Sequence, residues 1–152
     1  MLYIYFVDRY CYPSPRQYMQ AKLDELGIGK IASVSGRYYA MDRDNNWDRE
    51  EKAYAAFVYG EGNHAANAQE AIEASYADDK TDEFVLPCVT CEGGRVQDGD
   101  TVIFMNFRPD RARQMTRIFC DDAFTGGHIS GTQPEGATPR HLGVVDGLAE
   151  GV

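Results

Sequence analysis

Short apolar runs alternate with longer amphipathic stretches along most of this chain. The apolar runs are rich in β-branched and aromatic side chains, which is typical of buried strands. We expect strands at residues 2–7, 31–34, 84–86 and 102–105. Between them, apolar positions recur at helical spacing.

Helices are expected at residues 16–26, from about 47 to 59, at 66–76 and at 109–119. In the first of these, Tyr18, Leu23 and Leu26 should face inward, and Gly27 should end the helix. Pro109 suits the first position of the last helix.

The second helix has the clearest start and end. Asn46 or Asp48 can cap it, Tyr54 and Phe57 supply its apolar face, and Gly60 should end it. Glutamates at positions 50 and 51 suit the positive end of its dipole. Asparagine and arginine are interleaved with the acidic residues between positions 42 and 51, a pattern that indicates a solvated loop.

Strands that alternate with helices predict an α/β fold. We expect a three-layer α/β/α domain with a central, at least partly parallel sheet, over residues 1–124. The remaining residues, 125–152, hold seven glycines, two prolines and no aromatic residue. That composition predicts a poorly ordered C-terminal tail.

Composition and charge narrow the possible functions. A hydrophobic fraction of 43% excludes wholesale disorder, and a net charge of −9 argues against nucleic acid or anionic membranes as partners. No signal peptide or membrane span is evident, so we expect a cytoplasmic protein with reduced cysteines.

Arginine is concentrated in two segments. Arg37, Arg43 and Arg49 lie six residues apart after the expected strand at 31–34, and Arg108 and Arg111 follow the expected strand at 102–105. Guanidinium groups repel one another unless anions satisfy them, and two arginines at a helix start also oppose the helix dipole. If both segments lie at one sheet edge, they form a site for a small, doubly anionic ligand.

The alternative is internal neutralisation by nearby aspartates. Asp42, Asp44 and Asp48 could pair with the first arginine segment, and Asp110, Asp121 and Asp122 with the second.

Cys88 and Cys91 have half the spacing of a zinc site. No second cysteine or histidine pair completes it, so we expect no metal site and interpret these cysteines as buried small residues beside a strand.

The stretches IASVSGRYYAMDRDNNWDREEKAY, DEFVLP and DGDTVIFMNFRPDRARQMTRIF resemble the cofactor-independent phosphoglycerate mutases, in their inserted substrate-binding (phosphotransferase) domain. The resemblance spans roughly residues 28–124. It implies an isomerase, of glycolysis and gluconeogenesis, that interconverts 3-phosphoglycerate and 2-phosphoglycerate by way of a phosphoserine. The serine and two Mn²⁺ ions would belong to a separate phosphatase-like domain, and no cofactor would be bound by this chain.

The resemblance also implies roles for particular residues. Arg37, Arg43, Arg108 and Arg111 match family arginines that contact the substrate carboxylate and phosphate. Where the family has Asp-Gly-Arg-Asp, this chain has Asp-Arg-Tyr-Cys, so only Asp8 is left as a candidate catalytic acid.

Both ends of the chain depart from the family pattern, which suggests a truncated or frameshifted gene piece. We therefore expect a substrate-clamping domain that is inactive alone. The alternatives are a stand-alone binding module for a phosphorylated acid and a vestigial fragment without activity.

Overall fold

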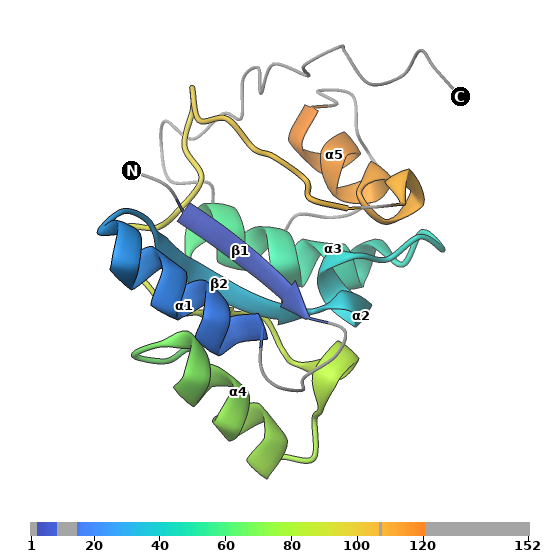
Figure 1. The fold of residues 1–152 in the computed structure, drawn as a ribbon. Helices are drawn as coiled ribbons and strands as arrows, with labels where there is room; N and C mark the ends of the chain where they lie inside the picture. Colours follow the sequence, from blue (N-terminus) through green and yellow to red (C-terminus); the bar gives the residue numbers. More distant parts are fainter. Residues whose placement is uncertain (1–2, 9–14, 107, 121–152) are drawn as a thin grey trace.

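The computed structural model describes residues 3–8, 15–106 and 108–120, which form a mixed four-stranded sheet with helices around it (Figure 1). The strands are β1 (Tyr3–Asp8), β2 (Lys30–Gly36), β3 (Asn63–His64) and β4 (Cys88–Val89), in the order β1-β2-β4-β3. β1 pairs with β2 in parallel, β2 with β4 antiparallel, and β3 with β4 in parallel. The predicted α/β fold with a partly parallel sheet is confirmed.

The four predicted helices form, and two further helical segments occur at residues 37–40 and 82–84, where no helix was predicted. The helical elements are α1 (Pro15–Leu26), α2 (Arg37–Ala40), α3 (Trp47–Tyr54) with its π-helical continuation η1 (Ala55–Tyr59), α4 (Ala68–Ala77), the 3₁₀ turns η2 (Asp82–Phe84) and η3 (Pro109–Arg111), and α5 (Arg113–Cys120).

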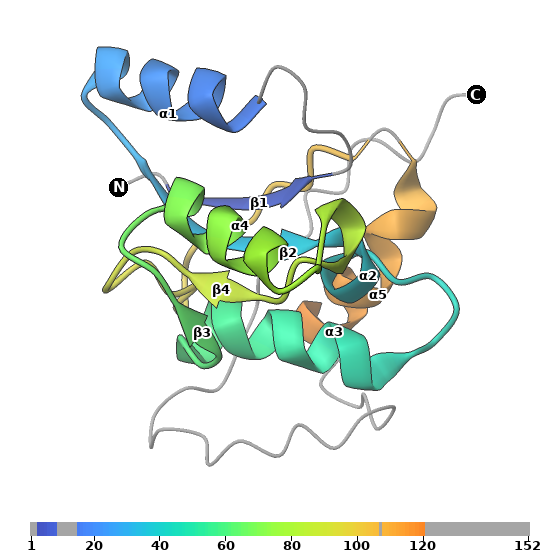
Figure 2. The ribbon, with the colours of Figure 1, turned by 90° about the horizontal axis from the view of Figure 1, so that it is seen from below.

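Two hydrophobic clusters hold the layers together. One joins α1 and α4 to β2 through Leu23, Ile31, Val34 and Ile72. The other is a larger cluster that joins α2, α3, η1, β4 and α5, with Phe57 in it. Figures 1 and 2 show α1 and α4 on one side of β2, and α3 with α5 on the other. The sheet is therefore the middle layer of three.

Glycines end two helices as the sequence predicts, but the asparagine that caps a helix is not the predicted one. Gly60 ends η1 in the left-handed conformation, at φ 69°, and Gly27 follows α1 at φ 64°. The Asn67 side chain accepts a hydrogen bond from the Glu70 amide and so caps α4. Asn46 precedes α3, but its side chain does not cap the helix and binds Asp42 instead.

Two predicted strands are wrong. Residues 82–84 form the turn η2, and the pairing partner of β2 is Cys88–Val89 instead of the run at 84–86. Residues 102–105 form no strand among the described residues, and the side chains of Ile103 and Met105 are 73% and 91% exposed. An apolar run indicates β propensity, but it does not indicate whether a partner strand lies beside it.

Leu26, predicted to face inward, is exposed. It is the last residue of α1, where the helix has passed beyond the hydrophobic cluster that buries Leu23. The predicted tail at 125–152 lies outside the described residues. No described helix combines the length and apolar character needed to span a bilayer.

Candidate anion-binding site

The first arginine segment begins where two parallel strands end. Asp8 closes β1 and Gly36 closes β2, and their backbones lie opposite each other in the parallel register. Arg37 is the next residue and opens α2. Carboxyl ends of parallel strands form the usual ligand edge of α/β folds, so the sequence prediction placed this segment correctly.

Arg37 is paired, but not with the aspartates that the sequence offered. Its Nε donates to Glu83 Oε2 at 2.5 Å, and its Nη2 contacts the same oxygen. Glu83 is 46 residues away along the chain, in η2. Sequence reasoning missed this residue because nothing local marks it as a partner of Arg37.

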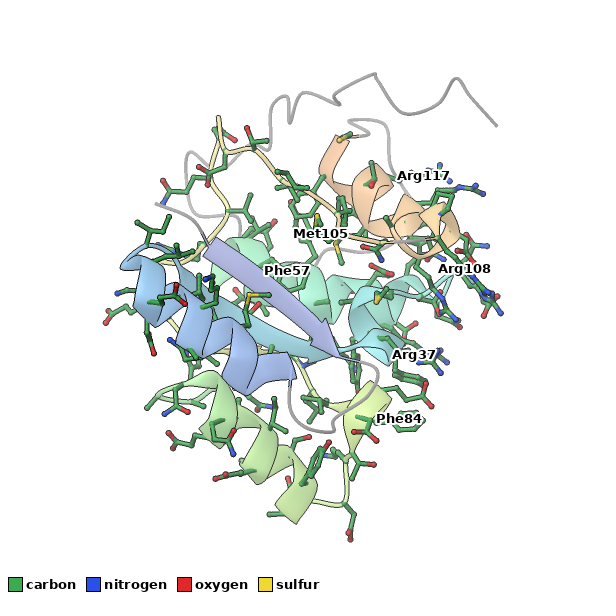
Figure 3. The ribbon with its side chains drawn as sticks, in the orientation of Figure 1. Arg37, Phe57, Phe84, Met105, Arg108 and Arg117 are labelled. Carbon is green, nitrogen blue, oxygen red and sulfur yellow. The ribbon has the colours of Figure 1, made fainter. Side chains whose placement is uncertain are left out.

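The second arginine segment lies against the first. Arg111 Nη1 donates to the Met41 carbonyl at 2.9 Å, and Arg43 Nη1 lies 3.3 Å from Asp110 Oδ2. The two segments therefore lie in contact, but the strand expected before the second segment does not form among the described residues. Figure 3 shows Arg37 and Arg108 on the same side of the molecule, toward which β1 points.

Positive charge remains available at this edge. Arg108 is exposed and has no ion-pair partner among the described residues, and the Arg43–Asp110 contact is long and solvent-accessible. Pairs of that kind contribute little free energy. Asp110 therefore neutralises Arg43 in part, whereas the alternative interpretation paired this aspartate with the second arginine segment. Among the described residues, Arg108 remains available to attract an anion.

Asp42 is a buried residue whose carboxylate accepts several hydrogen bonds. Its Oδ2 accepts hydrogen bonds from the Asp44 and Asn46 amides at 2.9 Å each, and from Gln114 Nε2 at 3.2 Å. Burial raises its pKa, but the hydrogen bonds from Asn46, Asp44 and Gln114 outweigh burial, so the pKa lies below its ordinary value. Asp42 thereby fixes the loop that carries Arg43 and ties it to α5.

Glu50 lies in the same buried network and is fully buried. Its Oε1 accepts a hydrogen bond from the Asp42 amide at 2.7 Å, whereas its Oε2 has no hydrogen-bond partner within the described part of the chain. Burial raises the pKa of Glu50 to about 8, against the opposing effect of the Asp42 amide. The side chain is therefore mainly neutral at pH 7, and the expectation of a solvated residue at this position is wrong.

Aromatic rings support the first arginine segment. The Arg49 guanidinium lies 3.9 Å from the centroid of the Tyr38 ring, and the same side chain lies 3.5 Å from Asp42. Tyr38 also packs against Phe84, with ring centroids 5.3 Å apart. Arg49 thus has a structural role in the loop.

Cys88 and Cys91 have half the spacing of a zinc site. Cys88 is buried in β4, as predicted, and Cys91 is partly exposed in the turn after it. Among the residues with described placement, no three histidine, cysteine or carboxylate side chains come together to hold a metal ion.

Comparison with known proteins gives the family. The family model "BPG-independent PGAM N-terminus" matches residues 14–140. The chain belongs to this family. The match begins before residue 28 and continues past residue 124, so the similarity is longer than the sequence motifs indicated.

Relatives of the chain carry the corresponding name. It is 61% identical over 112 residues to the 2,3-bisphosphoglycerate-independent phosphoglycerate mutase of Lachnoclostridium phytofermentans, covering 71% of this chain and 22% of the relative. It is 55% identical over 126 residues to that of Symbiobacterium thermophilum, covering 82% and 23%. The chain thus spans less than a quarter of the length of these relatives.

A solved structure shows the same fold. The phosphoglycerate mutase of Leishmania mexicana, crystallised at low cobalt concentration, superposes with a TM-score of 0.69 at 32% identity. The superposition covers 75% of this chain and 23% of the Leishmania chain. The α/β domain described here therefore has the fold of the corresponding part of the Leishmania protein.

Proposed function

We propose that this chain binds 3-phosphoglycerate or 2-phosphoglycerate between its two arginine segments and holds it for phosphoryl transfer. The proposal rests on the Arg111–Met41 and Arg43–Asp110 contacts, which bring the two arginine segments together. In addition, Arg108 has no ion pair among the described residues.

A phosphoglycerate has the chemistry that such an edge would recognise. It carries a carboxylate and a phosphate on one short skeleton, and each accepts paired hydrogen bonds from a guanidinium fork. Arg37, Arg43, Arg108 and Arg111 are the proposed binding residues. Because these arginines come from two segments, they can hold the carboxylate and the phosphate of the ligand at the same time. They would therefore orient the ligand as well as neutralise its charge.

Asp8 is the proposed acid–base residue. Its backbone closes β1 directly opposite Gly36, one residue before Arg37. A carboxylate at that position would lie at the same edge as the arginines and could hold or move a hydroxyl proton of the ligand. Because the family motif around Asp8 is incomplete in this chain, an Asp8→Asn substitution is the first test of whether this carboxylate takes part.

The remainder of the reaction belongs to the other part of a mutase. Residues 1–124 would form the substrate-binding domain, and the serine nucleophile and two Mn²⁺ ions would be supplied by the phosphatase-like part, in the same polypeptide or in a separate one. The phosphatase-like part would supply the serine that carries the phosphoryl group and the metal ions that activate this serine. This chain supplies orientation and charge neutralisation.

Complementation tests this division of labour. The purified chain is mixed with a Lachnoclostridium phytofermentans mutase from which the segment equivalent to residues 14–120 has been deleted, and conversion of 3-phosphoglycerate to 2-phosphoglycerate is followed with Mn²⁺ present. We expect activity from the mixture and none from either component alone.

The control is the Arg108→Ala/Arg111→Ala variant, which should fail to complement. If the wild-type chain binds phosphoglycerate but never restores activity, it is a stand-alone binding module. Turnover by the chain alone would contradict the proposed division.

A further inference from the structure

The turn η2 is fitted closely onto the start of α2. Gly36 has no side chain, and a Cβ at this residue would lie 2.2 Å from the Glu83 carbonyl oxygen. The Gly36 amide also donates to the Val85 carbonyl at 2.8 Å. The backbone of Glu83 is therefore fixed against the end of β2, immediately beside Arg37.

The Glu83 side chain then holds the guanidinium of Arg37 by one edge. A single oxygen, Oε2, accepts from Nε at 2.5 Å and also contacts Nη2. Because a guanidinium is planar and rigid, two nitrogens held on one side determine the direction of the third. Arg37 Nη1 has no hydrogen-bond partner among the described residues, so its donors remain available.

A ring contact reinforces the same arrangement. Phe84 packs on Tyr38 with ring centroids 5.3 Å apart, so η2 is attached to α2 on both sides of the Glu83–Arg37 pair. Figure 3 shows Phe84 beside Arg37 at the edge of the molecule that also presents Arg108. An aromatic contact of this kind restricts rotation of the whole turn.

We propose that Glu83 is a positioning residue of the anion site, which orients Arg37 so that Nη1 faces the bound phosphoglycerate. The ligand in this inference rests on the proposed function. Two effects of Glu83 compete, because its negative charge also reduces the attraction of Arg37 for an anion. If orientation dominates, removing the carboxylate weakens binding, whereas if charge reduction dominates, removing it strengthens binding.

The test is a double-mutant cycle measured by calorimetric titration of 3-phosphoglycerate. Glu83→Ala should weaken binding about tenfold, in line with the loss of a charge-assisted hydrogen bond that orients the guanidinium. Glu83→Gln keeps an acceptor oxygen and should remain within about threefold of wild type. In an Arg37→Ala background, Glu83→Ala should have no further effect.

Two results would overturn the inference. Binding that is unchanged or tighter in Glu83→Ala would show that charge reduction dominates. A loss of equal size in the Arg37→Ala background would show that Glu83 acts through the fold instead. Thermal unfolding of each variant provides the structural control, and because the pair is partly exposed we expect small shifts.

A second readout separates this inference from the proposed function. The Arg37 Nε–H resonance in a ¹⁵N-labelled chain, without ligand, should be slow to exchange in wild type and fast in Glu83→Ala. If wild type binds no 3-phosphoglycerate, the proposed function fails, and the resonance still decides whether Glu83 holds Arg37. Identical exchange in both proteins would overturn the inference.

Discussion

Gly36→Ala should destabilise the chain by about 3 kcal/mol or more, because the new methyl group would overlap backbone atoms that cannot move aside. A Cβ at Gly36 would lie 2.2 Å from the Glu83 carbonyl oxygen and 2.7 Å from the Val85 amide nitrogen. The backbone of Gly36, at φ −70° and ψ 152°, suits any residue, so the whole cost is steric. Equilibrium unfolding in urea measures the change in free energy.

Gly27→Ala is the matched control for this prediction. Gly27 has a left-handed backbone, at φ 64°, but open space where a Cβ would lie. Its substitution should cost only about 1 kcal/mol, the penalty of a left-handed conformation for an L-residue. A Gly36→Ala variant no less stable than this control would show that η2 does not lie tightly against β2.

Glu50 should make the stability of the chain fall as the pH rises from about 5 to about 8. Its pKa is about 8 in the folded chain and 4.5 for an ordinary glutamate. Between these values the folded state binds a proton that the unfolded state has lost, so the free energy of unfolding decreases with pH and levels off above the folded pKa. The slope attributable to this one group is about 1.4 kcal/mol per pH unit.

Glu50→Gln removes the titration and keeps the shape of the side chain. The difference in unfolding free energy between wild type and this variant should therefore move in favour of the variant as the pH rises. Urea unfolding at several pH values between 5 and 9 measures it. Glu61→Gln, at an exposed position, controls for the loss of one negative charge. A parallel pH dependence of wild type and Glu50→Gln would contradict the buried, neutral state of Glu50.

The helices could be predicted from sequence because their signals are local. Helical spacing of apolar residues and a glycine at the end located α1 and α3 with η1, as the positive φ values of Gly27 and Gly60 bear out. The strand at 102–105 could not be predicted correctly, because pairing depends on a neighbour elsewhere in the chain. The side chains of Ile103, Phe104 and Met105 are exposed in the structure.

The candidate site, like the fold, could be predicted only in part from the sequence. Clustered arginines are visible in the sequence, and their convergence followed from the expectation that both segments lie at one edge. Glu83 and Glu50 were missed because packing determines their roles. Glu83 meets Arg37 from a distant turn, and Glu50 looked like an ordinary charge at a helix start but is fully buried against Asp42.

Calorimetric titration of 3-phosphoglycerate into the wild-type chain and the Arg108→Ala/Arg111→Ala variant tests the central claim most directly. Arg95→Ala, at an exposed arginine beside Gly60, controls for the loss of a positive charge elsewhere on the surface. The account predicts binding by wild type and Arg95→Ala, and a loss of at least about a hundredfold in the double variant, since two charge-assisted contacts are removed. Equal binding by all three proteins, or no binding by a wild-type chain shown to be folded, would contradict it.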